Sequence, residues 1–197
     1  MIFVMMKLRT MMNIRSITLL CGVTCTAFAS AVTWDNFPTW DGNVTNGWLG
    51  QAQIAAAPAE NILTDYRVQF DTAMTGQNVT FSIRDWDGTN VMGATYFSDT
   101  FAANGIQQYS GLNLALVTGT TYAFVFDFQG YAGASLQYDA QGANLPGFGA
   151  WFDGTNWSQF PTLDQKATIT WSAVPEPGTM AVVALGLAAL ARRKKKS

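Results

Sequence analysis

Apolar and polar residues alternate along much of the chain between residues 32 and 172. The clearest example places Val79, Phe81 and Ile83 on one face of an extended segment and polar side chains on the other face. A period of two is typical of a strand with one buried and one solvated face, and no stretch of this region keeps the 3.6-residue period of an amphipathic helix. The pattern therefore predicts a body built from β-strands.

Five segments have a strong strand pattern, and four more have a weaker one. The only helical signal is the alanine-rich stretch 52–63, which Pro58 interrupts, so we expect the end of a strand and a loop there. Short strands with tight turns between them predict an all-β fold, a two-sheet β-sandwich of jelly-roll type. The strong segments are 65–70, 79–84, 122–128, 134–138 and 167–171, and the weaker ones are 48–54, 91–97, 107–112 and 149–152.

Glycine next to aspartate or asparagine marks the connections between these segments. Two connections repeat the sequence Asp-Gly-Thr-Asn, at residues 87–90 and 153–156. Glycine adopts a positive φ without steric cost and Asp or Asn tolerates one, so both sites predict hairpin turns.

The N-terminal end has a different composition. Three basic residues precede an apolar run at 17–28 that ends in small residues, which is the pattern of a secretory signal peptide. We expect a leader over residues 1–31, recognised by the Sec translocon and then removed. Two Ala-x-Ala cleavage sites compete, one before Ser30 and one before Val32, and we favour the second.

The C-terminal end contains three successive segments. Val-Pro-Glu-Pro at 174–177 is held extended, because Pro175 and Pro177 fix φ and lack a backbone donor. An uncharged apolar run follows at 178–191, and as a helix it is roughly 20 Å long, short of the ~30 Å hydrocarbon core. The chain ends in a basic tail at 192–197, whose cations are Arg192, Arg193, Lys194, Lys195 and Lys196.

We predict that the apolar run spans the membrane as one short transmembrane helix. Local thinning of the bilayer and snorkelling of the flanking cations compensate for its length at modest cost. Cations beside a span stay in the cytoplasm, so the precursor is anchored in the inner membrane with its body outside.

A proline-containing triplet, a short apolar helix and a basic end resemble the PEP-CTERM sorting signal of exosortase-dependent bacteria. The match rests on Pro175, Glu176 and Pro177, on the Gly-Leu pair at 186–187 and on the basic tail. The resemblance implies that an exosortase cuts near the triplet and passes the body to the cell surface or into extracellular polysaccharide. The alternative is an ordinary single-span anchor behind a proline-rich linker.

The body is similar to the β-sandwich cargo domains that precede such tails. The similarity rests on Asp-Trp-Asp-Gly at 85–88, on residues 111–122 leading into an apolar strand, and on Asp164 before the last strand. It implies a fold and a surface location but no biochemical activity.

Charges are segregated along the chain, which its net charge of −2 hides. Between residues 32 and 174 there are twelve acidic and three basic residues, a net charge of −9. Such a body repels nucleic-acid phosphates, so we expect no nucleic-acid partner. The chain has no histidine, and Cys21 and Cys25 both lie in the predicted leader. The usual catalytic triad and zinc ligands are therefore missing, and we expect neither an enzyme nor a cofactor.

Asp85, Asp87 and Asn90 have a spacing in which alternate oxygen atoms meet on a calcium ion. The match is incomplete, because an EF-hand loop has glycine at its sixth position and a bidentate glutamate at its twelfth, and here glycine is the fourth residue. A hairpin turn is the alternative that we favour for this segment.

The chain has seven tryptophans, which is many for its length. Trp86, Trp151 and Trp157 have acidic and amide residues nearby and are candidates for stacking on sugar rings, since amphipathic rings suit half-wet sites. Packing in the core is the alternative that we favour for any single tryptophan.

Together these patterns predict an exported cell-surface or extracellular-matrix protein whose molecular activity is unassigned. The first alternative is a carbohydrate-binding module for extracellular polysaccharide. A glycoside hydrolase is more remote, because hydrolysis needs two acidic side chains across a cleft and nearly all of these acids lie in predicted turns.

Overall fold

The computed structural model describes residues 30–39, 44–45, 47–131, 136–139 and 145–173. The predicted leader up to residue 29, the Pro-Glu-Pro triplet, the predicted membrane helix at 178–191 and the basic tail lie outside these residues. Within the described part, no helix has the length and apolar character that a membrane span requires. Residues Ser30–Ala173 form one compact unit.

β-Strands dominate this unit, with two short 3-10 helices between them. In chain order the elements are β1 (Ala31–Asp35), η1 (Phe37–Thr39), β2 (Val44–Thr45), β3 (Gly50–Ala56), β4 (Ile62–Gln69), η2 (Thr72–Met74), β5 (Asn78–Trp86), β6 (Val91–Ala102), β7 (Ile106–Ala115), β8 (Thr121–Asp127), β9 (Leu136–Asp139), β10 (Phe148–Phe152), β11 (Trp157–Phe160), β12 (Asp164–Gln165) and β13 (Ala167–Ser172).

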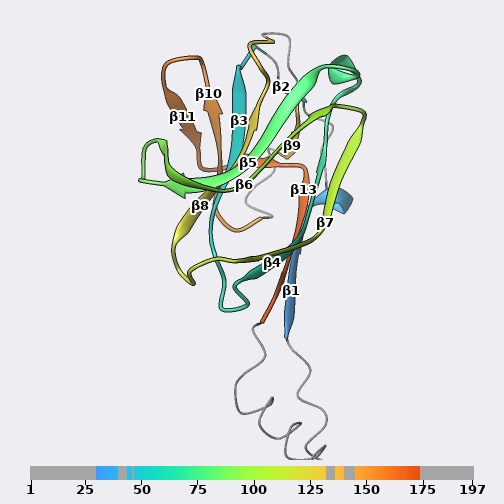
Figure 1. The fold of residues 1–197 in the computed structure, drawn as a ribbon. Helices are drawn as coiled ribbons and strands as arrows, with labels where there is room; N and C mark the ends of the chain where they lie inside the picture. Colours follow the sequence, from blue (N-terminus) through green and yellow to red (C-terminus); the bar gives the residue numbers. More distant parts are fainter. Residues whose placement is uncertain (1–29, 40–43, 46, 132–135, 140–144, 174–197) are drawn as a thin grey trace, which may run out of the picture. The chain divides into compact units, whose positions relative to one another are not determined.

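The strands form two large sheets and one small one (Figure 1). The four-stranded sheet has the order β1-β13-β4-β7, the six-stranded sheet has the order β11-β10-β3-β8-β5-β6, and β12, β9 and β2 form the third. Every pair is antiparallel. The prediction of an all-β sandwich is confirmed.

The core lies between the facing sides of the two large sheets. Tyr66 of β4 stacks on Phe124 of β8 with 5.1 Å between ring centroids, and Phe81 of β5 stacks on Phe126 of β8 at 4.8 Å. Trp171 of β13 is also fully buried in this layer. Burying one large apolar side chain stabilises a fold by ~1.5–3 kcal/mol. This aromatic layer therefore supplies the cohesion that disulfides supply in many exported domains.

The predicted strands are largely those of the structure. Val79, Phe81 and Ile83 are buried, as their alternation predicts. β3 ends at Ala56 and β4 begins at Ile62, so the alanine-rich stretch is a strand end and a loop, as expected. The sequence missed β1, β2, β11 and β12. The two-residue strands β2 and β12 are too short for a periodic pattern, and only pairing with their neighbours defines them.

The first strand bears on the cleavage site of the leader. β1 begins at Ala31, which pairs with Ser172, and the backbone amide of Ala173 donates to the carbonyl oxygen of Ser30 at 2.8 Å. Cleavage before Val32 removes both of these contacts, because it removes Ser30 and Ala31, whereas cleavage before Ser30 keeps both. Both sites remain predictions.

A network of buried polar side chains connects β3, β4 and the β12–β13 segment. Nε2 of Gln53 donates to Oδ1 of Asp164 at 2.8 Å, and Oε1 of Gln53 accepts from the backbone amide of Gln165 at 3.0 Å. The Tyr66 hydroxyl donates to Oε1 of Gln165 at 2.8 Å. Burial, with the nearby charge of Asp164, raises the pKa of Tyr66 far above its ordinary range. Tyr66 therefore stays protonated and keeps this bond.

Candidate functional site

The face of the six-stranded sheet that points away from the core carries a second apolar cluster. Phe124 and Phe126 of β8 point into the core, so Ala123 and Val125 point to the opposite face. The cluster consists of Ala52, Ile54, Trp86, Ala123, Val125 and Ala150, with Val91, Phe148 and Trp157 packed against it.

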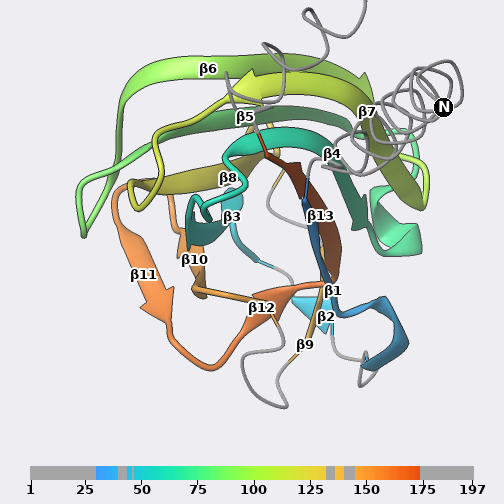
Figure 2. The same cartoon turned by 90° about the horizontal axis from the view of Figure 1, so that it is seen from below.

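Two distant strands of this sheet meet across the cluster. Nε2 of Gln159 on β11 donates a hydrogen bond of 2.7 Å to the carbonyl oxygen of Gly88, in the turn between β5 and β6. Trp86 of β5 and Trp157 of β11 meet edge to face, with 6.4 Å between ring centroids. Three strands separate β11 from β5 in the sheet order, so these contacts require a strong bend, as Figure 2 shows. The bend makes this face concave.

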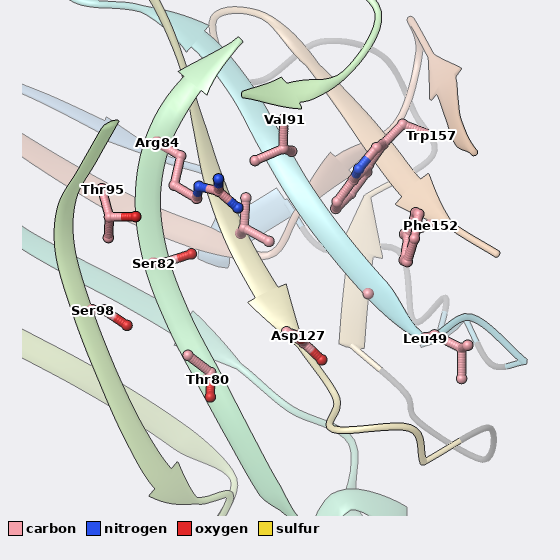
Figure 3. Close-up of a pocket in the computed structure, with 12 residues that line it drawn as sticks. Leu49, Thr80, Ser82, Arg84, Val91, Thr95, Ser98, Asp127, Phe152 and Trp157 are labelled. Carbon is pink, nitrogen blue, oxygen red and sulfur yellow. The ribbon is translucent and has the colours of Figure 1, made fainter. Parts of the chain in front are cut away.

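A groove of about 370 Å³ opens on the concave face. Figure 3 shows hydroxyl side chains from β5 and β6 on one side of it and two aromatic rings from β10 and β11 on the other. The lining residues are Leu49, Gly50, Thr80, Ser82, Arg84, Val91, Thr95, Ser98, Val125, Asp127, Phe152 and Trp157.

Phe152 and Trp157 form the aromatic side of the groove. They are directly paired on β10 and β11, and their rings stack with 5.2 Å between centroids and 29° between planes. Gly50 on β3 is paired with Phe152, and a Cβ atom there would lie 3.7 Å from Cη2 of Trp157 and 3.2 Å from the carbonyl oxygen of Phe126. The missing side chain at Gly50 therefore keeps space beside the two rings.

Hydroxyl groups form the opposite side. Ser82 of β5 is directly paired with Ser98 of β6. Oγ1 of Thr80 lies 2.8 Å from Oγ1 of Thr100 and accepts a hydrogen bond of 2.8 Å from Nε2 of Gln129. A hydroxyl both donates and accepts, so this side offers both kinds of hydrogen bond to a polar ligand.

Two charged side chains line the groove, Arg84 on β5 and Asp127 on β8. Oδ1 of Asp127 accepts from the backbone amide of Gln129 at 2.8 Å. The pairing of β5 with β6 changes register on both sides of Arg84, and such bulges change the direction of a side chain. In Figure 3 the Arg84 side chain extends from β5 towards β8. Its Nε atom is buried, and no described group accepts a hydrogen bond from it.

The three candidate carbohydrate-binding tryptophans do not share one surface. Trp157 is half-buried and lines the groove, whereas Trp86 is 8% exposed and belongs to the apolar cluster. Trp151 is 7% exposed and packs on Phe160, with 4.1 Å between ring centroids. Alternation along β10 turns Trp151 to the face opposite Phe152. Packing thus covers most of Trp86 and Trp151, as the alternative for single tryptophans expects, and a role of either in carbohydrate binding stays a prediction.

Sequence reasoning missed Arg84, Asp127 and Phe152 as site residues. Part of the signal was present, because Thr80, Ser82 and Arg84 form the polar face of a strand whose other face is apolar. Alternation does not show which strands flank that face, so it does not predict a groove there.

The segment considered as a calcium loop is a hairpin turn. Oδ1 of Asp87 accepts from the backbone amides of Thr89 (2.8 Å) and Asn90 (2.6 Å), and these bonds hold the pKa of its carboxyl below the ordinary range. Asp85 instead accepts from the Tyr96 hydroxyl at 2.8 Å, which raises the pKa of Tyr96 to about 12. The two carboxylates thus have different partners, and these contacts account for the segment without an ion. In the described part of the chain, no three acidic, cysteine or histidine side chains gather as metal ligands.

The second Asp-Gly-Thr-Asn turn repeats this geometry. Oδ1 of Asp153 accepts from the backbone amides of Thr155 (2.7 Å) and Asn156 (2.8 Å), and its pKa is lowered for the same reason. The glycines of the two turns have φ values of 101° (Gly88) and 104° (Gly154). Both predicted hairpin turns are confirmed.

The fold is similar to parts of solved clostridial proteins. A variant of the clostridial cysteine protease Cwp84, after propeptide cleavage, has a TM-score of 0.53 and 11% identity over 73% of this chain and 40% of that chain. The cysteine protease and lectin-like domains of Cwp84, a surface layer associated protein of Clostridium difficile, give a TM-score of 0.48 and 9% identity over 65% of this chain and 32% of that one. This chain thus spans about a third to two fifths of the length of those proteins. The first of these similarities is one of fold.

Sequence comparison gives a different kind of result. No curated protein matches the chain. A family model described as the PEP-CTERM protein-sorting motif matches residues 173–196, which include the Pro-Glu-Pro triplet, the apolar run and the cations of the basic tail. The sorting signal that the sequence predicted is thereby confirmed. The chain therefore carries a PEP-CTERM protein-sorting motif at residues 173–196, and this motif implies that it is exported.

Proposed function

We propose that this protein is an exported surface or matrix component whose β-sandwich binds extracellular polysaccharide in the concave groove, without catalysing a reaction. The observation that carries the proposal is the combination, in one groove of about 370 Å³, of the stacked rings of Phe152 and Trp157 with a row of hydroxyl side chains. A sugar ring has apolar faces and a polar rim, so it uses both sides of such a groove.

The dimensions of the groove support the same class of ligand. Pockets for small ligands measure about 300–1,000 Å³ and combine an apolar lining with a few polar groups that fix orientation. Here the apolar lining comes from Leu49, Val91 and Val125 beside the two rings, and the bonding groups come from β5, β6 and β8.

Binding without catalysis is supported by the charges of the groove. Asp127 is the one carboxylate among the described lining residues. Glycoside hydrolysis uses two carboxyl groups about 5–10 Å apart, one as acid and one as base or nucleophile. The hydrolase alternative therefore finds no pair in this groove.

The sorting motif supports a route to the surface. In this route the leader at 1–31 directs the chain to the Sec translocon, and a helix at 178–191 holds the precursor in the inner membrane with the basic tail in the cytoplasm. An exosortase then cuts near Pro175, Glu176 and Pro177. The body leaves the membrane for the cell surface or the extracellular matrix.

A jelly-roll connectivity is part of the proposal. Its support is that successive strands cross between the large sheets, from β3 to β4, from β4 to β5, from β6 to β7 and from β7 to β8. In addition, the first and last strands, β1 and β13, are neighbours in one sheet. A double-sheet jelly roll of two Greek keys has such crossings.

A glycan array tests the binding function directly. The full-length chain is purified in a detergent without a sugar headgroup, so that the detergent does not occupy the groove. We expect binding to one class of polysaccharide and loss of most of it in Trp157→Ala. Tyr131→Ala is the control, because Tyr131 is an exposed aromatic residue outside the groove. Absence of binding to every glycan, or equal loss in both variants, contradicts the proposal.

A further inference from the structure

The three cations of the acidic body have different surroundings. The guanidinium carbon of Arg67 lies 3.9 Å from the centroid of the Phe37 ring. Nζ of Lys166 donates to Oε1 of Gln137 at 3.1 Å, and Lys166 is buried. Arg84 faces the groove. Of the three, Arg84 is the cation placed where a bound ligand would meet it.

The guanidinium of Arg84 has no protein partner within the described residues. Its Nε atom is buried without an acceptor, and no ion pair or hydrogen bond joins the side chain to a described residue. Leaving a buried donor of a charged group without an acceptor costs free energy. The half-buried Arg84 side chain also lines the groove, so an acceptor in the groove can meet the part of the guanidinium that faces it.

Asp127 is not placed to neutralise Arg84. Along β8, Asp127 is level with Thr80, whereas Ala123 is level with Arg84, four residues away. At 3.3 Å per residue this separation is about 13 Å along the strand. Asp127 also accepts a hydrogen bond from the backbone of Gln129. The groove thus has a cationic region near Arg84 and an anionic region near Asp127.

We infer that the groove recognises an acidic polysaccharide, one whose sugars carry carboxylate groups, and that Arg84 binds the carboxylate. This inference rests on the proposed function and names its ligand class. The planar fork of a guanidinium matches a carboxylate with two parallel hydrogen bonds, a geometry that a lysine cannot reproduce. The sugar ring lies against Phe152 and Trp157 while its acidic group reaches Arg84.

Because the body is acidic, attraction of an acidic polysaccharide is limited to the contact with Arg84. With a net charge of −9 between residues 32 and 174, the body repels a polyanion at long range. At an ionic strength of 0.15 M the Debye length is about 8 Å, so the repulsion is screened beyond the first layer of contacts. A half-buried pair at Arg84 is screened less. Binding therefore depends on that one contact rather than on a general attraction.

Affinity electrophoresis of the full-length chain, in a detergent without a sugar headgroup and at 0.15 M salt, tests the inference. The probes are polygalacturonate (carboxylated), dextran sulfate (sulfated) and dextran (neutral). Arg84→Gln removes the charge, and Arg84→Lys keeps the charge but loses the fork. Arg67→Gln is the matched control, because it lowers the net charge of the body equally from a position outside the groove. Each variant is first shown to keep the cooperative thermal transition of the parent.

We expect polygalacturonate to bind best, and Arg84→Gln to weaken that binding by about tenfold or more, since a hydrogen bond to a charged group is worth ~1.5–3 kcal/mol. The affinity of Arg84→Lys for polygalacturonate should lie between those of the parent and Arg84→Gln. Arg67→Gln should bind polygalacturonate like the parent. Equal binding of polygalacturonate by Arg84→Gln and parent overturns the inference, as does preference for dextran sulfate or dextran. In each of these cases glycan binding itself stands. If no glycan binds on the array or here, the proposed function fails as well.

Discussion

The side-chain amide of Gln159 and the backbone carbonyl of Gly88 are 71 residues apart in the chain and joined by a hydrogen bond of 2.7 Å. This bond connects β11 to the turn between β5 and β6 and spans the concave face on which the groove opens. Replacing Gln159 by Ala should cost about 0.5–1 kcal/mol of unfolding free energy, because the freed carbonyl is rehydrated. A thermal melt should show a fall of about 2–4 °C in Tm per kcal/mol.

A matched control exists for this change. Gln108 is exposed on β7, and its amide bonds only to Ser110, two residues away, among the described contacts. Gln108→Ala should leave both stability and glycan binding unchanged, whereas Gln159→Ala should also weaken binding. Equal melts for the two variants contradict a stabilising role for the Gln159 bond.

The two Asp-Gly-Thr-Asn turns should make stability depend on acid. The pKa values of Asp87 and Asp153 are lowered in the folded state, so the folded state binds fewer protons than the unfolded state. Their contribution is present above the ordinary aspartate pKa of about 3.9 and is lost as the pH falls through the lowered values. The variant Asp87→Asn with Asp153→Asn should therefore lose less stability than the parent between pH 5 and pH 3. Denaturant unfolding across this range measures the difference, and parallel curves would count against it.

Tyr66→Phe should destabilise the core by about 1–3 kcal/mol, because it leaves Oε1 of Gln165 buried without a donor. Nε2 of Gln165 already lacks a described partner, so the whole amide would be unpaired. Tyr96→Phe is the control, since Tyr96 donates to Asp85 at an exposed site where water replaces it. Urea unfolding should separate the two variants, and a cost for Tyr96→Phe as large as that for Tyr66→Phe contradicts the argument.

The pKa of Tyr66 also predicts how the parent responds to alkali. Its folded-state pKa is raised, so its contribution to stability is complete below the unfolded pKa of about 10 and declines as the pH rises above it. Tyr66→Phe should remove the part of the decline in unfolding free energy that comes from ionisation of Tyr66. Unfolding free energies at pH 8 and pH 10.5 give the test, and an unchanged decline in the variant would refute it.

The fragment 30–173 should fold without metal or reductant, because it contains no cysteine and holds the whole aromatic core. Far-UV circular dichroism should show β structure with a cooperative thermal transition that EDTA does not change. Loss of the transition in EDTA would restore the calcium hypothesis for Asp85, Asp87 and Asn90.

Surface material should lack the C-terminal tail. The triplet at 175–177 contains two prolines, which fix φ and lack a backbone donor, and we therefore expect processing to depend on it rather than on the apolar run alone. Mass spectrometry should find no peptide that reaches residue 191, and Pro175→Ala with Pro177→Ala should block processing. Normal processing of that variant would show that the cutting enzyme does not need the triplet.

Local chemistry in the sequence determined much of this protein. The alternation of Val79, Phe81 and Ile83 predicted a strand and its buried face, because successive side chains of a strand point to opposite sides whatever its partners are. Asp-Gly-Thr-Asn predicted the turns at 87–90 and 153–156 for an equally local reason, since the aspartate accepts from amides two and three residues ahead. The sorting motif could be predicted from the sequence because its prolines, apolar run and cations are adjacent in the chain and do not depend on the fold of the body.

Only the tertiary structure decided where the groove lies. Trp151 and Phe152 are adjacent on β10, so their side chains point to opposite faces of the sheet. Which of the two contacts Trp157 depends on the strands that pair with β10. Arg84 occupies one of several polar strand positions, and the contacts of Gln159 with Gly88 and of Trp157 with Trp86 bend the sheet around it. Such pairings join segments far apart in the chain, and the packing free energy of the whole sheet selects them. A periodic pattern within one strand carries no information about that choice.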